Sequence, residues 1–137
     1  MGLNQKINQL YDTYKSMDLE RRRSEYNHVS KKYPDRVPIL LRAELDDTMF
    51  ETDQTSLMDV KIKYVVPSDL TFAHLMQTLR TRLPNLRKET GLFLCINGSL
   101  PVMTHMLSQG LQDKDRDDDG FFTVTLITEN TFGHSIN

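Results

Sequence analysis

The sequence predicts an α+β roll, in which one long helix crosses a mixed four-stranded sheet and two further helices precede the sheet. The first observation is the order of periodic segments: helix, helix, strand, strand, helix, strand, short helix, strand. The second is the length, because 137 residues make a one-domain chain that can bury about two-thirds of its unfolded surface. The third is the single strongly amphipathic helix between the second and third strands.

Two helices are expected before the sheet. One apolar face runs through residues 3–15, formed by Leu3, Ile7, Leu10, Tyr11 and Tyr14. A second helix is expected over residues 18–32, capped by Asp18 or Ser16 and stopped by Pro34, because the residue before a proline disfavours the helical region. Its apolar face is thin, so it should lie on one side of the domain.

The first two strands come next. Residues 37–41 are apolar and contain Pro38, which cannot donate to a β-ladder and should therefore lie at an edge or opening of the sheet. Residues 43–58 are acidic and irregular, which is typical of a loop. Residues 60–66 alternate apolar and basic side chains, which predicts a half-buried strand with its two lysines on one face.

The clearest helix is expected over residues 72–83. Thr71 is a good N-cap, and Pro84 ends the helix. Leu70 and Leu75 are spaced to form a hydrophobic staple across the cap.

Three shorter elements complete the prediction. Residues 92–96 form an apolar run typical of a central strand, and the pair Asn97-Gly98 predicts a turn after it. Residues 104–111 should form a short helix and residues 121–128 the last strand. The part of the chain after the two helices is thus ββαββ.

Composition excludes several functional classes. The 17 Lys and Arg against 19 Asp and Glu argue against a domain that wraps nucleic acid. The single cysteine, Cys95, excludes a disulfide framework and a Cys-rich zinc site, and favours the cytosol or nucleus. No apolar run approaches the ~20 residues that span a bilayer, and the first ten residues lack the apolar stretch of a signal peptide.

No catalytic or metal-binding motif is present. Asp115, Asp117 and Asp119 match the start of an EF-hand loop, but Leu126 stands where a bidentate Glu is required. Cys95 lies in an apolar strand, which favours a buried structural thiol. We therefore expect no enzyme, no metal and no cofactor.

Three features leave functional alternatives open. The basic residues between Arg21 and Arg42 form either a solvated face or a surface for an acidic partner. The strand at 60–66 is either an edge that pairs with an extended peptide or an edge that its lysines protect from aggregation, and the pattern favours neither. Phe132-Gly133 near the end is a weaker signal: a glycine without Cβ lets an enzyme approach its carbonyl.

Four motifs occur in register: KYPDRVP at 32–38, KYVVPSDLT at 63–71, DGF at 119–121 and ENTFG at 129–133. Over about residues 17–133 the chain resembles the autophagy ubiquitin-like modifier family, of the autophagy-related protein eight or GABA-receptor-associated-protein type. The resemblance implies a ubiquitin-like β-grasp core at 34–128, a helical extension at 1–33 packed on the core, and a flexible tail at 129–137.

The resemblance also implies a function. A cysteine protease would cut after Gly133, and activating and conjugating enzymes would transfer the glycine to phosphatidylethanolamine. The modifier would be a soluble monomer in the cytoplasm before conjugation. On the autophagosome membrane it would then recruit receptors that carry an aromatic-x-x-aliphatic peptide flanked by acids.

The resemblance carries over to particular residues. The aromatic pocket would consist of Glu25, Val29, Pro38, Lys63, Val65 and Phe121. The aliphatic pocket would consist of Tyr64, Val66, Pro67, Leu70 and Leu75. Arg36 and Lys61 would meet the acids, and Arg82 matches a basic position tied to processing.

The chain also departs from the family. Val29 and Val65 replace larger side chains, so wider pockets are expected, and the loop at 44–59 is longer than in close relatives. Two rival functions remain: a peptide-binding adaptor whose tail is never cut, and a ubiquitin-fold scaffold with neither activity.

Overall fold

The computed structural model describes residues 2–50, 60–83, 86–87 and 90–130. Its helices are α1 (Leu3–Lys15), α2 (Leu19–Lys32), α3 (Phe72–Arg82) and the short α4 (Leu107–Gly110), with 3₁₀ turns η1 (Asp47–Met49) and η3 (Asp113–Asp115). Its strands are β1 (Arg36–Glu44), β2 (Lys63–Pro67), β3 (Leu92–Ile96) and β4 (Phe122–Thr128). The predicted order of elements is confirmed, as is the α+β class.

The four strands form one mixed sheet in the order β2-β1-β4-β3. The central pair, β1 and β4, is parallel, and the two outer pairs are antiparallel. Pro38 pairs with Val65 of β2, whereas the ladder with β4 begins one residue later, at Ile39 and Phe122. Pro38 therefore lies at an opening on the β4 side, as its missing N–H predicts.

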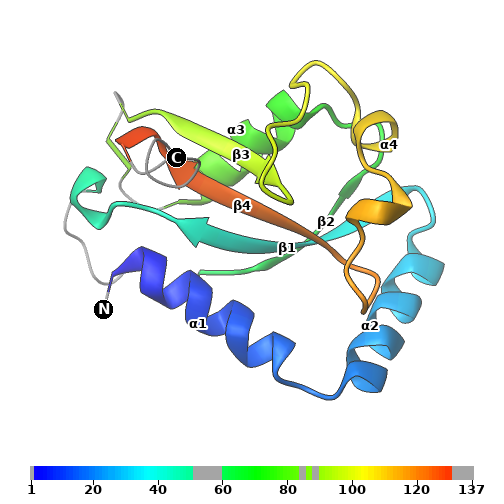
Figure 1. Ribbon diagram of the computed structural model, residues 1–137. Helices are drawn as coiled ribbons and strands as arrows, with labels where there is room; N and C mark the ends of the chain where they lie inside the picture. Colours follow the sequence, from blue (N-terminus) through cyan, green and yellow to red (C-terminus); the bar gives the residue numbers. More distant parts are fainter. Residues whose placement is uncertain (1, 51–59, 84–85, 88–89, 131–137) are drawn as a thin grey trace.

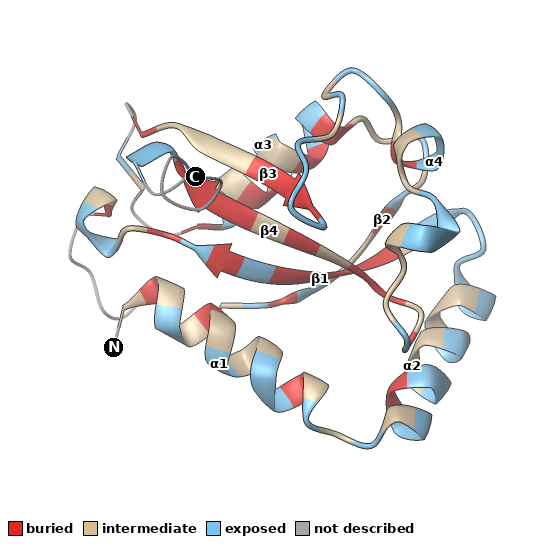
Figure 2. Cartoon of the chain, in the orientation of Figure 1, coloured by how far each residue is buried: buried red, intermediate tan, exposed pale blue. Residues whose placement is uncertain are grey.

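Helices cover both faces of this sheet (Figure 1). α3 crosses one face and buries Phe72, Leu75 and Leu79. Thr71 caps it through its side chain, which accepts a hydrogen bond from the N–H of His74. α1 runs along β1 on the other side, and the exposed surface of α2 is visible in Figure 2. Among the described residues, no helix is long and apolar enough to cross a bilayer.

Three predicted strands differ from the structure. The 92–96 segment lies at the edge of the described sheet and not at its centre, because it stands last in the strand order and pairs with β4 alone among the described strands. The first strand continues to Glu44, two residues into the expected loop. The second begins at Lys63 and not at residue 60, although the carbonyl of Ile62 still accepts the Leu41 N–H at 2.8 Å.

The expected helix at 104–111 is shortened to α4. The preceding carbonyls are used elsewhere: those of His105 and Met103 accept the N–H groups of Phe72 and Ala73, each at 3.0 Å. These two N–H groups at the start of α3 have no partner inside their own helix. The segment before α4 thus completes the start of α3.

A buried ionic cluster fastens α1 and α2 to the turn before β4. The side chain of Asp119 is fully buried, and its carboxylate lies 2.7 Å from the Lys15 ammonium and 2.8 Å from the Arg22 guanidinium. Burial alone raises the pKa of Asp119, but hydrogen bonds from the two cations bring that pKa below its usual value. Arg22 therefore belongs to the interior, and neither the basic run nor the acidic turn is purely solvated.

Candidate peptide-binding groove

Strand β2 forms one edge of the described sheet, with β1 as its neighbour. Side chains of a strand alternate between its faces, so Lys63 and Val65 form one row and Tyr64 and Val66 the other. Lys63 is exposed, Tyr64 and Val65 are half-buried, and Val66 is buried. The strand therefore has a row of side chains on each side and an edge between them.

On the α2 side, an ion pair links the strand to the helix. The Lys63 ammonium is 2.8 Å from one carboxylate oxygen of Glu25, and the Tyr14 hydroxyl donates to the other at 2.9 Å. The same ammonium lies 4.0 Å from the centre of the Tyr14 ring. Burial raises the pKa of Glu25, but the Lys63 and Tyr14 hydrogen bonds outweigh it and lower that pKa. Val29, one helical turn after Glu25, is half-buried.

Aromatic rings and a proline lie beneath this ion pair. Phe121 is 3% exposed, and its ring meets those of Tyr14 and Tyr26 edge-on at 5.8 and 5.5 Å. Pro38 is buried and pairs in register with Val65. These side chains provide an apolar floor suited to an aromatic ring, with a charged pair at its rim.

On the α3 side, the residues predicted for the aliphatic pocket extend from β2 to the first turns of α3: Tyr64, Val66, Pro67, Leu70 and Leu75. Leu75 is fully buried and Val66 is 7% exposed. These two residues would form the floor of the pocket, beneath a bound side chain. Leu70 is half-buried and Pro67 is exposed, and the Leu70 N–H donates to the Pro67 carbonyl at 3.1 Å. These two residues are placed to form the wall.

The two cations predicted to meet acidic residues lie at opposite ends of β2. Arg36 pairs in register with Pro67, and its guanidinium donates to the Val65 carbonyl at 3.4 Å. Lys61 precedes the strand, and its side chain is exposed. A peptide along β2 would therefore have a cation near each end.

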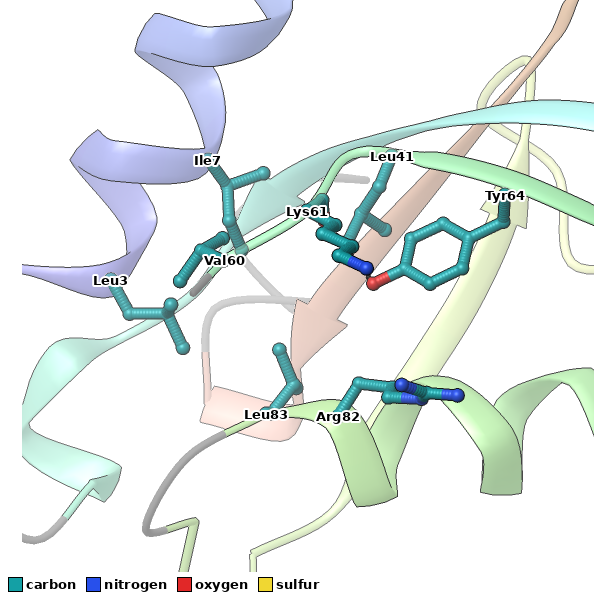
Figure 3. Close-up of a pocket in the computed structure, with 8 residues that line it drawn as sticks. All are labelled: Leu3, Ile7, Leu41, Val60, Lys61, Tyr64, Arg82 and Leu83. Carbon is teal, nitrogen blue, oxygen red and sulfur yellow. Dashed lines mark hydrogen bonds between the residues drawn. The ribbon is translucent and has the colours of Figure 1, made fainter. Parts of the chain in front are cut away.

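Arg82 lines a pocket of about 290 Å³ near the beginning of β2 (Figure 3). Lys61 and Tyr64 come from the β2 side of this pocket, and Arg82 comes from the end of α3. Burial raises the pKa of Tyr64, and the positive charge of Arg82 partly opposes that shift. Arg82, the predicted processing residue, thus lines a pocket together with two residues predicted to bind the peptide, Lys61 and Tyr64.

Two aromatic residues of this site were not predicted from the sequence. The sequence places Tyr14 only on the apolar face of the first helix, and it places Tyr26 only within the second helix. Both meet Phe121, about a hundred residues further along the chain. The spacing of residues within one helix carries no signal for such a contact. The predicted cleavage residues Phe132 and Gly133 lie outside the described residues.

Comparison with known proteins identifies the family. The family model described as "Autophagy protein Atg8 ubiquitin like" matches residues 21–133. The chain belongs to the Atg8 family. It is therefore a ubiquitin-like autophagy protein, as the four motifs indicated.

Curated members and solved structures are similar to nearly the whole chain. "Autophagy-related protein 8c" of Arabidopsis thaliana is 38% identical over 116 residues, 84% of this chain and 89% of that protein. "Autophagy-related protein 8e" of the same plant is 36% identical over 118 residues, 86% of this chain and 89% of that protein. The crystal structure of Trypanosoma brucei ATG8 has a TM-score of 0.66 at 29% identity and covers 83% of this chain and 90% of its own.

A second Atg8 structure shares the fold at lower identity. Plasmodium falciparum Atg8, solved in complex with a Plasmodium falciparum Atg3 peptide, has a TM-score of 0.63 at 18% identity. The match covers 82% of this chain and 91% of that one. The ubiquitin-like β-grasp fold is thus shared across these proteins.

Proposed function

We propose that this Atg8-family chain is a lipid-conjugated modifier whose β2 edge binds receptor peptides. The observation that carries the proposal is the arrangement around β2. An apolar floor lies on each side of an edge strand, and a cation lies near each end. An extended peptide pairs with such an edge through its main chain, while alternate side chains enter the two pockets.

The pockets suit an aromatic-x-x-aliphatic peptide flanked by acids. The aromatic side chain would enter between α2 and β2, above Phe121, where ring contacts are available. The aliphatic side chain would enter between β2 and α3, against Tyr64 and Leu70. Arg36 and Lys61 would attract the flanking acids, chiefly by steering the peptide and setting its register.

Conjugation is the second part of the proposal. A cysteine protease would cut after Gly133, and activating and conjugating enzymes would join the glycine to phosphatidylethanolamine. The related Plasmodium falciparum Atg8 is solved with an Atg3 peptide, which favours a peptide of the conjugating enzyme as a partner for this fold. Arg82, exposed at the end of α3, is our candidate for contact with the processing enzyme.

Lipid attachment would move the protein from the cytoplasm to the autophagosome membrane. Each buried CH₂ of a lipid chain contributes ~0.8 kcal/mol, and a single chain binds a membrane only reversibly. Phosphatidylethanolamine carries two chains, so the conjugate would be held stably.

The deciding experiment follows the protein in cells after autophagy is induced. Intact-mass spectrometry should find chains that end at Gly133 and chains that carry phosphatidylethanolamine, and the latter should float with membranes. A Gly133→Ala variant should remain full length, because the added Cβ obstructs the approach to the scissile carbonyl. If every wild-type molecule ends at Asn137 and none floats, the protein is a peptide-binding adaptor and not a modifier.

A further inference from the structure

Asp46 holds the end of β4 against the turn that follows β1. Its backbone N–H donates to the Thr128 hydroxyl at 3.0 Å, and one of its carboxylate oxygens accepts from the side-chain amide of Asn130. The other carboxylate oxygen accepts from the N–H and the hydroxyl of Thr48, at 2.9 and 2.7 Å. Thr48 therefore orients the Asp46 carboxylate through one oxygen, and the other oxygen binds Asn130.

Glu129, which lies between Thr128 and Asn130, is held by the segment that precedes β3. The Glu129 N–H donates to the Gly91 carbonyl at 2.9 Å. A Cβ on Gly91 would lie 2.7 Å from a carboxylate oxygen of Glu129, so the glycine permits this close approach. Three consecutive residues, 128–130, are thus fastened to the body of the domain, and we call them the C-terminal stem.

The carboxylate of the next residue, Asp47, binds the start of α1. Asp47 accepts the backbone N–H of Asn4, in the first turn of α1, at 3.1 Å. That N–H is one of those that a helix cannot satisfy internally. Asp46 and Asp47 thus form a pair of adjacent acids, of which one binds the stem and the other binds the start of α1.

We propose that Asp46 is a positioning residue for processing at Gly133, an inference that rests on the proposed function. Gly133 is three residues beyond Asn130. Three residues reach at most about 10 Å from their point of attachment. A protease that docks on the domain therefore meets the scissile bond in a small volume, which raises its effective concentration.

A recess beside the stem leaves room for that enzyme. A pocket of about 270 Å³ is lined by Met49, Thr90, Gly91, Glu129 and Asn130. A docked enzyme would find space next to the clamped residues.

The test measures KM and kcat for cleavage of the full chain after Gly133 by the family's cysteine protease, read by mass spectrometry. Asp46→Ala and Asn130→Ala each remove the contact that fixes Asn130, so that Glu129 becomes the last fixed residue. The tether to Gly133 then grows from three residues to four, and the volume within its reach grows about two- to threefold. KM should rise by about that factor while kcat stays unchanged. The double variant should behave like either single variant, since both remove the same contact.

Two matched variants separate positioning from a general effect of charge. Asp46→Asn keeps one oxygen that accepts from Thr48 and presents its NH2 group to Asn130, whose side-chain amide can turn over so that its oxygen accepts. This variant keeps the contact without the charge and should retain the wild-type KM. Asp47→Ala removes one negative charge at the adjacent position but no contact to the C-terminal stem. This variant should also retain the wild-type KM. Amide hydrogen exchange at Glu129 should be faster in Asp46→Ala than in Asp47→Ala, which reports the loss of the clamp before any cleavage.

The outcomes distinguish this inference from the function on which it rests. A wild-type chain that is never cut overturns both. A wild-type chain that is cut, with the same KM in Asp46→Ala and Asp47→Ala, overturns the role of Asp46 alone. Faster cleavage of Asp46→Ala would mean that the contact restrains the stem, which also overturns the proposal.

Discussion

The ammonium of Lys63 and the carboxylate of Glu25 lie 2.8 Å apart and link β2 to α2 at the place proposed for the aromatic side chain of a bound peptide. The two side chains are 44% and 37% exposed, so the pair is accessible to a ligand. An acidic peptide that uses Lys63 must share it with Glu25 or displace it. The ion pair therefore opposes binding as well as orienting the lysine.

Glu25→Gln should strengthen binding of an acidic aromatic-x-x-aliphatic peptide. The amide preserves the shape of the rim but no longer competes for Lys63, and an exposed ion pair is worth up to about 1 kcal/mol. Affinity should rise about two- to fivefold and depend more strongly on salt. Isothermal titration at two salt concentrations measures both effects. Lys63→Glu serves as the opposite control and should weaken binding; tighter binding in this variant would contradict the model.

Tyr64→Ala should remove the aromatic contact that Tyr64 contributes to the proposed aliphatic pocket. Loss of one well-buried anchor contact costs about 2 kcal/mol, so affinity for the same peptide should fall more than tenfold. Leu100→Ala is the control, because Leu100 is 50% exposed and lies outside the groove. Titration calorimetry on both variants compares them directly, and equal affinities would exclude Tyr64 from the site.

Asp119→Asn should destabilise the fold, because it leaves Lys15 and Arg22 without the buried charge between them. Breaking a buried ion pair by removing one partner costs about 3–5 kcal/mol. Asp118→Asn is a close control, since the Asp118 side chain is 64% exposed and lies 3.6 Å from Arg22. Urea denaturation of both variants should show the large loss in Asp119→Asn only.

Stability should fall on acidification, through Asp119 in particular. Its pKa is lower in the folded state than in the unfolded chain, so the unfolded chain takes up its proton at a higher pH. The stabilisation is present above the unfolded pKa of about 3.9 and is lost as pH falls through the folded value. Denaturation between pH 6 and pH 2 should show this loss in wild type. A slope equally steep in Asp119→Asn would assign it to other carboxyl groups.

Cys95 should react slowly with thiol reagents in the folded protein. Burial raises its pKa, and the negative charge of Glu44 adds to that shift, so little thiolate forms near neutral pH. The residue is also only 3% exposed, which limits the access of a reagent to its thiol. A maleimide or disulfide reagent at pH 7.5 should label the native chain far more slowly than the urea-denatured chain. Equal rates would show that the strand opens readily.

The sequence predicted those elements whose signals are local. The cap at Thr71, the apolar face of α3 and the alternation around Lys63 depend on neighbours within one element, and the structure confirms them. The position of β3 at the edge could not be predicted in this way. An apolar run reports burial of its faces, whereas an edge is defined by which strand lies alongside.

The contacts that the sequence could not predict join distant segments. Asp119 lies in a run of acids, so nothing in its own surroundings distinguishes it from the exposed Asp118. Its burial depends on Lys15 and Arg22, about a hundred positions earlier. The contacts of Tyr14 with Glu25 and Phe121 could not be predicted either, because they also join residues of different elements. The family resemblance predicted which residues would bind the peptide, but it did not predict the ion pair between Lys63 and Glu25.

The parallel pairing of β1 with β4 constrains when this protein becomes native. Ile39 and Phe122 are partners at the centre of the sheet, so the nascent chain cannot form that pair until its last strand has been synthesised. Long-range pairing of this kind also slows folding, because a large loop must close before the contact forms. A chain interrupted before Phe122 would lack the strand that joins β1 to β3, so β4 must be synthesised before the four-stranded sheet can form.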